Sequence, residues 1–256
     1  MNILILVGTL TRGGAEKQAI LDAGILSANN KVTLVTYSDG PLRQLANENI
    51  QIIVLNQKSY PLKIHRLIKL IKQNHIKIIH AYLMGPLIQS GIAGILTQIN
   101  IIWHIHSHLY KSGFISKCLL KFLAYSSPVK LITYVNKELR DYFEKKLKFP
   151  HSKGNILYNA SNIKKNKKAN NHKIVIGFVG RLIPLKRVEY LIEMAYSLTF
   201  SGMPEFEIWV VGDGTHKKTL EKQARDFKVG KNVKFKGFHI DVLAFYETFD
   251  IFILPS

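Results

Sequence analysis

The feature that most restricts the fold of this chain is a repeated pattern of short apolar runs, each followed by a turn and an amphipathic segment. A short apolar run between turn signals is typical of a strand that is buried on both faces of a parallel sheet. The pattern occurs in two successive series with a polar tract between them. The sequence therefore predicts an α/β protein with two Rossmann-like doubly wound domains, and a ligand site in the cleft between the carboxyl ends of their strands.

The polar tract marks the expected domain boundary. Residues 163–172 are rich in Lys and Asn and have almost no large apolar side chains, which indicates a basic linker between domains. The first domain is expected at residues 1–162 and the second at residues 173–256. In the first domain, strands are predicted at Asn2–Val7, Val32–Tyr37, Gln51–Leu55, Lys77–His80, Asn100–His106, Val129–Val135 and Gly154–Leu157. A helix is predicted at Lys137–Lys148, between the last two of these strands. In the second domain, strands are predicted at Lys173–Val179, Glu207–Val211, Val233–Lys236 and Ile251–Leu254.

The start of the second domain carries the strongest signal for a ligand. Its first apolar run stops at Gly180, and Arg181 follows at once. Lys186 and Arg187 then stand at the head of an amphipathic helix. A glycine lets a ligand approach the backbone, a helix N-terminus offers free N–H groups, and the cations add full charges, which together suit a diphosphate. An ordinary strand–loop–helix with solvated cations also fits this stretch taken alone.

Glycines follow other predicted strands as well. Gly13 and Gly14 stand between the first strand and the first helix, where they could hold a phosphate or let a substrate approach the backbone. Two adjacent glycines at such a turn are equally common without any ligand. In the second domain, Gly212 and Gly214 follow the second strand and Gly237 ends the third.

Three histidines gather at the end of one strand of the first domain. His104, His106 and His108 alternate along the chain, so they point to the same side for as long as the strand continues. Three histidines could bind a metal, but no carboxylate or cysteine at helical spacing accompanies them. The preferred interpretation is a hydrogen-bonding histidine that points into the ligand cleft, with His106 as the best candidate.

The chain is strongly basic, with a formal net charge of +19. This charge suits anionic partners such as nucleotide sugars or phospholipid headgroups. A genome that favours Lys, Asn and Ile codons explains it equally well, and the linker has that composition. No helix-turn-helix, RRM, KH or zinc pattern accompanies the charge, so no nucleic-acid partner is expected.

Two segments combine basic and apolar side chains with helical spacing. In Pro61–His75, isoleucines and leucines form one face and lysines another, as in a membrane-surface helix or, more commonly, a packed helix with a solvated cationic face. Leu109–Ala124 is the better membrane candidate because aromatic residues flank its lysines. The single cysteine, Cys118, excludes an intrachain disulfide. A cytoplasmic protein is expected, because neither a signal peptide nor a spanning helix is recognisable. The two basic amphipathic segments favour a peripheral position at the inner face of the cytoplasmic membrane.

Taken together, these motifs resemble those of the retaining glycosyltransferases with the GT-B fold, of the group 1 or family 4 type. Their order and spacing cover nearly the whole chain, and their combination is much more specific than any one of them. The matching motifs are G-G-A-E at Gly13–Glu16, W-H-I-H-S-H at Trp103–His108, N-A-S from Asn159, F-V-G-R-L-x-P-x-K at Phe178–Lys186, V-V-G-D-G at Val210–Gly214, V-K-F-K-G at Val233–Gly237 and D-I-F-I-L-P-S at Asp250–Ser256.

The resemblance implies a role for each matching residue. Arg181 and Lys186, beside Gly180, match the pair that binds the diphosphate of the sugar donor. The Gly13–Glu16 loop matches the loop next to the donor phosphate and the transferred sugar, and His106 matches the histidine that contacts this sugar. The second domain would hold a UDP- or GDP-sugar and the first a saccharide acceptor of the lipid-linked kind used in polysaccharide or lipopolysaccharide synthesis. No metal cofactor is expected, because two fixed cations can stabilise the leaving diphosphate and no D-x-D motif occurs.

The sequence departs from the family pattern at one point. In the family, the strand matched by Asp250–Ser256 leads into a loop with two glutamates in an E-x7-E motif, one near the transferred sugar and the other usually at the ribose. The sequence stops at Ser256, before that motif. Weak or no turnover is therefore expected from this chain alone, and an inactive truncated remnant or one half of a two-chain transferase is the alternative. G-G-A-E together with G-R-x-x-P-x-K argues against an epimerase or a phosphorylase.

Overall fold

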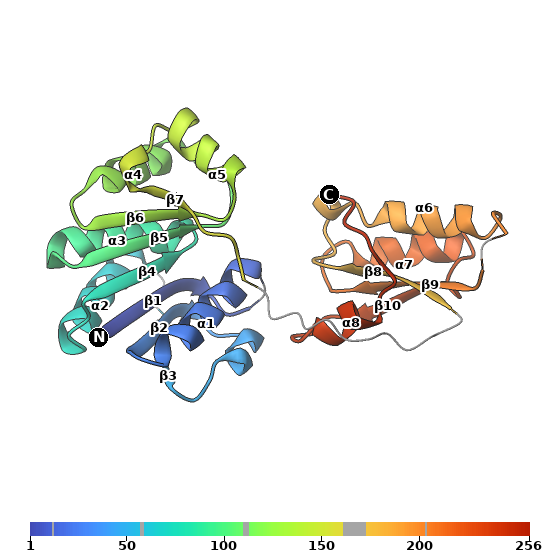
Figure 1. Ribbon diagram of the computed structural model, residues 1–256, viewed down its shortest axis with the longest axis horizontal. Coiled ribbons are helices and arrows are strands. Elements are labelled where there is room, and N and C mark those ends of the chain that lie inside the picture. Colours follow the sequence, from blue (N-terminus) through green and yellow to red (C-terminus); the bar gives the residue numbers. More distant parts are fainter. Residues whose placement is uncertain (12, 57–58, 110–112, 161–172, 203) are drawn as a thin grey trace. The chain divides into compact units, whose positions relative to one another are not determined.

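The computed structural model describes residues 1–11, 13–56, 59–109, 113–160, 173–202 and 204–256 (Figure 1). The chain divides into two compact units, Met1–Ser161 and Asn162–Ser256. The linker predicted at residues 163–172 lies outside the described residues. Within the described part of the chain, no helix has both the length and the apolar character that crossing a bilayer requires.

The first unit is built on a seven-stranded sheet in the order β3-β2-β1-β4-β5-β6-β7 (Figure 1). All neighbouring strands are parallel. The strands are β1 (Asn2–Thr9), β2 (Lys31–Ser38), β3 (Ile50–Val54), β4 (Ile78–Tyr82), β5 (Asn100–Ile105), β6 (Val129–Tyr134) and β7 (Gly154–Ile156). From β1 to β3 successive strands are added toward one edge of the sheet, and from β4 to β7 toward the other edge. The switch point therefore lies between β1 and β4, and ligands usually bind at such a point.

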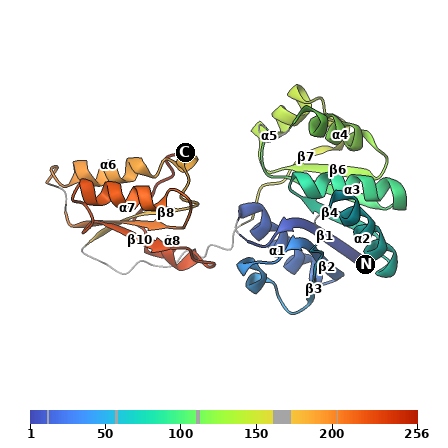
Figure 2. The same ribbon diagram turned by 180° about the vertical axis from the view of Figure 1, so that it is seen from behind.

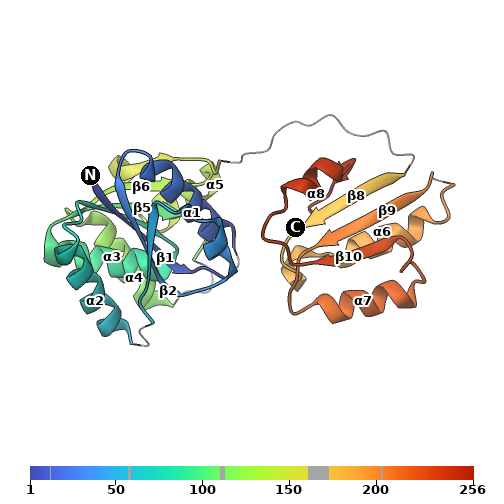
Figure 3. The same ribbon diagram turned by 90° about the horizontal axis from the view of Figure 1, so that it is seen from below.

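Helices cover both faces of this sheet, which explains why its strands are apolar throughout. On β1, Ile3, Ile5 and Val7 pack in the core under α1, whereas Leu4 and Leu6 belong to the core on the opposite face. Figures 2 and 3 show these layers from behind and from below. The helices are α1 (Gly14–Ser27), α2 (Tyr60–Gln73), α3 (Met84–Thr97), α4 (Phe114–Tyr125) and α5 (Lys137–Asp141).

Two helices of the first unit differ from the sequence prediction. The single helix expected at Lys137–Lys148 consists of α5, which Asn136 caps through a hydrogen bond from the Leu139 amide (2.8 Å), and a π-helical turn at Tyr142–Lys146. The helix expected from Leu109 begins only at Phe114, after Gly113 in extended conformation. Periodicity therefore located both helices but did not reveal the change of helix type or the late start.

The second unit contains a four-stranded parallel sheet in the order β10-β9-β8-β11. Its strands are β8 (Ile174–Val179), β9 (Phe206–Val211), β10 (Val233–Gly237) and β11 (Ile251–Phe252). Its helices are α6 (Glu189–Leu198), α7 (Lys217–Asp226) and α8 (Leu243–Thr248). Helices α6 and α7 pack on one face and α8 covers the other (Figure 3). The chain reverses direction between β8 and β11, so the loop after β8 stands at the switch point of this sheet.

Candidate functional site

The glycine turn of the first unit lies at the carboxyl end of β1, next to the switch point. Gly13 precedes α1 and accepts the amide of Lys17 (3.2 Å), and Gly14 is the first helical residue. A Cβ on Gly13 would overlap the carboxylate of Glu16, which folds back over the turn. Beyond its chain neighbours and the backbone of its own helix, a Cβ on Gly14 would meet no atom of the described residues within 4 Å. The packing of the fold therefore does not demand a glycine at position 14, and the space beside it is open.

The three histidines do not stay together, because β5 ends at Ile105 and the alternation ends with it. His104 is buried, and both of its ring nitrogens have partners: Nδ1 is 2.8 Å from Thr133 Oγ1 and Nε2 is 3.2 Å from His80 Nδ1. His108 lies against the ring of Tyr142. His106 stands half-buried directly after the last residue of the strand, where its ring contacts Tyr82 at a centroid distance of 5.6 Å.

Burial favours the uncharged imidazole at His80, His104 and His106. It lowers the pKa of His104 to about 3, helped by the neighbouring His80 and His106. Burial also lowers the pKa of His80 and of His106, and the Asp22 carboxylate opposes the effect in both. A neutral imidazole both donates and accepts a hydrogen bond, so His106 can contact a sugar hydroxyl without bringing a charge. Within the described part of the chain, no group of three or more His, Cys, Asp or Glu side chains is placed to hold a metal ion.

The second set of predicted residues lies at the carboxyl edge of the second sheet. β8 ends directly before Gly180, and Arg181 follows with an exposed side chain. Among the described residues, the Arg181 guanidinium has no hydrogen-bond or ion-pair partner. A short 3₁₀ turn, Pro184–Lys186, then leads to Arg187, whose φ of 48° lies in the left-handed region. The Lys186 ammonium is also exposed and donates to Ser256 Oγ at 3.2 Å. An unpaired cation beside a glycine at the switch point is the arrangement that an anionic group needs.

Main-chain contacts at two positions and a left-handed backbone at a third explain the glycines of this edge. A Cβ on Gly212 would lie 1.8 Å from the carbonyl oxygen of Gly180, and one on Gly214 would lie 2.2 Å from that of Leu182. The amide of Gly212 donates to the carbonyl of Gly237 at 2.7 Å, and Gly237 has a φ of 74°. The loops after β8, β9 and β10 therefore interlock through their backbones. Close main-chain contacts explain Gly212 and Gly214, and the left-handed backbone explains Gly237, whether or not these glycines touch a nucleotide.

Several polar groups near these sites were not singled out by the sequence. Asp22 on α1 accepts the hydroxyl of Tyr82 at 2.5 Å, a contact between residues sixty positions apart. In the sequence, the only indication of this hydrogen bond was the H-A-Y segment at the end of β4, whose alternation places His80 and Tyr82 on one face of the sheet. In the second unit, Glu189 Oε2 and His216 Nδ1 are buried without a hydrogen-bond partner among the described residues. They lie where α6 and α7 begin, close in sequence to the glycine loops.

Comparison with known families decides what kind of protein carries these sites. The model described as Glycosyltransferase Family 4 matches residues 12–165, more than half of the chain. The chain belongs to this family. A second model, described as Glycosyl transferases group 1, matches residues 159–256, so the two matches together span both units of the glycosyltransferase.

Individual relatives agree with this assignment. The glycosyltransferase is 24% identical over 256 residues to an uncharacterized glycosyltransferase of Haemophilus influenzae, covering 95% of this chain and 70% of the relative. It is 32% identical over 82 residues to the lipopolysaccharide core biosynthesis glycosyltransferase LpsE of Rhizobium meliloti, covering 32% of this chain and 23% of the relative. The crystal structure of HepE from Anabaena in complex with UDP-glucose superposes with a TM-score of 0.83 at 22% identity, covering all of this chain and 74% of HepE. The glycosyltransferase therefore has the GT-B fold, as predicted.

Proposed function

We propose that this glycosyltransferase transfers a sugar from a nucleoside-diphosphate donor to a saccharide acceptor, with retention of configuration at the anomeric carbon. The observation that carries the proposal is the exposed guanidinium of Arg181, which follows Gly180 at the switch point of the second sheet and has no partner among the described residues. Arg181 and Lys186 bind the diphosphate, and their charges stabilise the negative charge that it gains as it leaves. Because two cations do this work, the reaction needs no metal ion.

The first unit contributes the contacts to the transferred sugar. His106 offers a neutral imidazole, and the Gly13–Gly14 turn offers open space and the N-terminus of α1. UDP-glucose is the first donor to test, because HepE was crystallised with it; GDP-sugars are the alternative. The name of LpsE supports an acceptor of lipopolysaccharide or polysaccharide synthesis, which is commonly lipid-linked. Calorimetric titration with UDP, GDP and UDP-glucose tests the donor, and absence of binding by all three would contradict the proposal.

Replacing Gly14 by alanine tests whether this glycine is needed for donor binding rather than for folding. The added methyl group has no close contact with the described residues, and alanine favours a helix over glycine by up to about 1 kcal/mol. We therefore expect the free energy of unfolding to stay equal or rise slightly. The same methyl group intrudes where the sugar phosphate is proposed to lie. We therefore expect the affinity for UDP-glucose to fall by about tenfold or more, measured by calorimetry.

The matched control is Gly94→Ala, on α3 of the same unit. A Cβ there would lie 2.2 Å from Ile101 Cδ1, so this variant should lose stability and keep the affinity of its folded fraction. Equal affinity for UDP-glucose in Gly14→Ala and the unchanged protein would remove the glycine turn from the donor site.

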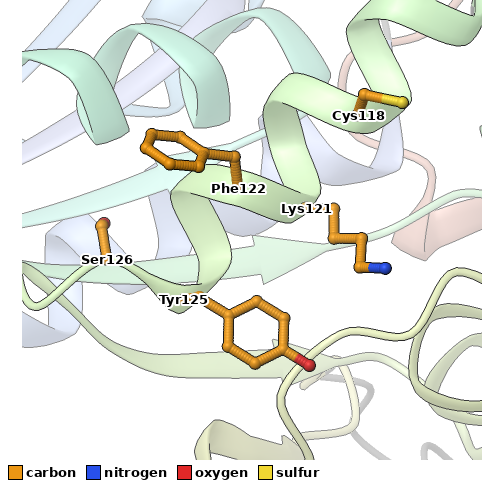
Figure 4. Close-up of a pocket in the computed structure, with 5 residues that line it drawn as sticks. All are labelled: Cys118, Lys121, Phe122, Tyr125 and Ser126. Carbon is orange, nitrogen blue, oxygen red and sulfur yellow. The ribbon is translucent and has the colours of Figure 1, made fainter.

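We also propose that helix α4 rests on an anionic membrane surface. It buries Leu120, Leu123 and Ala124 and turns its other face outward. Phe114, Ile115 and Phe122 are 80%, 82% and 69% exposed. Cys118, Lys121, Phe122, Tyr125 and Ser126 line a shallow hollow along this face (Figure 4). Aromatic side chains that insert at the acyl boundary, with lysines beside them for the headgroups, form the pattern of an interfacial helix.

Replacing Phe122 by glutamate tests this contact. Burial of a phenylalanine side chain is worth about 1.5–3 kcal/mol, and an added carboxylate is repelled by anionic lipid. We expect sedimentation with phosphatidylglycerol vesicles to weaken by about tenfold or more. Phe200→Glu, at a phenylalanine of the second unit that is 73% exposed, is the control and should sediment as the unchanged protein does. If Phe122→Glu binds vesicles like that control, α4 is not the membrane contact.

A further inference from the structure

A buried tyrosine connects two parts of the first unit that the proposed function uses separately. Tyr82, the last residue of β4, is completely buried, and its hydroxyl donates to Asp22 Oδ2 at 2.5 Å. Burial and the adjacent carboxylate raise the pKa of Tyr82 well above its ordinary value, so the hydroxyl keeps its proton and remains a donor. A hydrogen bond from a neutral donor to a charged acceptor is about twice as strong as one between neutral groups.

The ring of Tyr82 lies against the two histidines at the end of β5. It stacks on His104 with a centroid distance of 4.4 Å and an interplanar angle of 5°, and it contacts His106 with an angle of 39°. His104 cannot turn away, because Thr133 and His80 occupy its two nitrogens. Tyr82 therefore rests on a fixed platform and forms one wall beside His106.

Asp22, which accepts the hydrogen bond from Tyr82, lies on the helix that follows the glycine turn. Asp22 lies on α1, which begins at Gly14, and its second oxygen accepts the side-chain amide of Gln18 at 2.8 Å. Eight residues of α-helix span about 12 Å, and a helix of this length moves as a rigid rod. A bond that fixes Asp22 to Tyr82 therefore limits how far the glycine turn can move relative to the strand that ends beside His106.

We infer that Asp22 and Tyr82 are positioning residues that hold the imidazole of His106 and the Gly13–Gly14 turn in one fixed arrangement. The inference rests on the proposed function, because that function gives His106 and the Gly13–Gly14 turn their contacts with the sugar donor. A misplacement of a contacting group by about 1 Å can cost a large factor in rate, so such a tether would act on transfer without touching the substrate.

Tyr82→Phe is the main test, because it removes the hydroxyl and keeps the ring. We expect the ring signals of His106 in a ¹³C–¹H NMR spectrum of the 256-residue protein to move or to double, since the aromatic ring beside them is no longer held by Asp22. These signals are assigned by their loss in His106→Gln. Tyr134→Phe is the matched control: Tyr134 is also fully buried, and its hydroxyl has no hydrogen-bond partner among the described residues. It should leave the His106 signals in place.

Asp22→Asn tests the same hydrogen bond from its other end, and it can be measured even if Tyr82→Phe does not fold. The amide keeps an acceptor oxygen but lacks the charge, so the bond weakens and the His106 signals should move in the same direction by a smaller amount. Unchanged His106 signals in Tyr82→Phe, or in Asp22→Asn where the first variant does not fold, would overturn the inference.

Donor binding separates failure of this inference from failure of the proposed function. If both hold, Tyr82→Phe weakens UDP-glucose binding by about twofold to tenfold, the loss expected for one displaced hydrogen bond, and leaves UDP binding as it was. If the His106 signals move but neither Tyr82→Phe nor His106→Gln changes UDP-glucose affinity, the tether exists and the sugar-binding role of His106 is wrong. If the signals stay in place while His106→Gln weakens binding, the site is right and the tether is wrong.

Discussion

Arg181→Ala is expected to abolish most of the stabilisation by UDP that the proposed donor site predicts for this glycosyltransferase. The guanidinium is exposed, follows Gly180 at the switch point of the second sheet and has no partner among the described residues, so no other group competes for it. A hydrogen bond to a charged group is worth about 1.5–3 kcal/mol, which corresponds to an affinity lower by roughly 10- to 150-fold. The loss should be larger still in a double variant with Lys186→Ala, although two cations on one diphosphate need not act additively.

A thermal-shift titration with UDP measures this effect. UDP at a hundred times its Kd stabilises the folded protein by about 2.7 kcal/mol, and a hundredfold weaker Kd reduces that to about 0.4 kcal/mol. The titration is carried out with a chelator present, so that only the protein's own cations can hold the diphosphate.

The matched control for Arg181 is Arg225→Ala. Arg225 is equally exposed and lies in the last turn of α7, which runs back from the glycine edge of the sheet. This variant should keep the full shift with UDP. If Arg181→Ala also keeps it, the diphosphate does not bind at the loop after β8.

Mild acid is expected to destabilise the first unit through His104. Burial and the neighbouring histidines lower its pKa from the ordinary value of 6.5 to about 3, so the folded protein holds this imidazole neutral while the unfolded chain takes up a proton. Stability is therefore complete above pH 6.5 and falls steadily as the pH drops toward 3. With these two pKa values, the loss that His104 alone causes between pH 7.5 and pH 5 is about 2 kcal/mol.

Comparison with His104→Gln isolates this contribution. Glutamine does not titrate, so between pH 7.5 and pH 5 the variant should lose about 2 kcal/mol less unfolding free energy than the unchanged protein. Urea unfolding followed by Trp103 fluorescence reports on the first unit, provided that Trp209 is replaced by phenylalanine in both proteins.

The matched control for His104 is His65→Gln, at an exposed histidine on α2. It should show the same loss between the two pH values as the unchanged protein. An equal loss in His104→Gln and His65→Gln would show that His104 is not the group responsible.

The sequence predicted the strands and the two-series organisation well, because those depend on apolar runs and turns that are local in the chain. The predictions weakened where a strand or helix ends. The alternation of the three histidines held only as far as Ile105, and the helix from Lys137 gave way to a π-helical turn at Tyr142. Such endings depend on tertiary contacts, among them the packing of His108 against Tyr142.

The candidate site was predictable where a motif is contiguous and not where it is assembled from distant parts. Gly180, Arg181 and Lys186 stand within one short stretch, so their common position at the end of β8 followed from the sequence. The hydrogen bond between Asp22 and Tyr82 did not, because it joins a helix and a strand far apart in the chain. Nor could the sequence show that Gly212 makes room for the carbonyl of Gly180, since that requires the distance between two loops.

The exposed Cys118 on α4 gives this glycosyltransferase a natural attachment point for a reporter group. It is the only cysteine of the chain, so a thiol-reactive dye labels a single position without any engineered substitution. That position lies in the hollow that Phe122 and Tyr125 line. A dye whose emission depends on polarity would therefore report directly whether this face of the helix leaves water when vesicles are added.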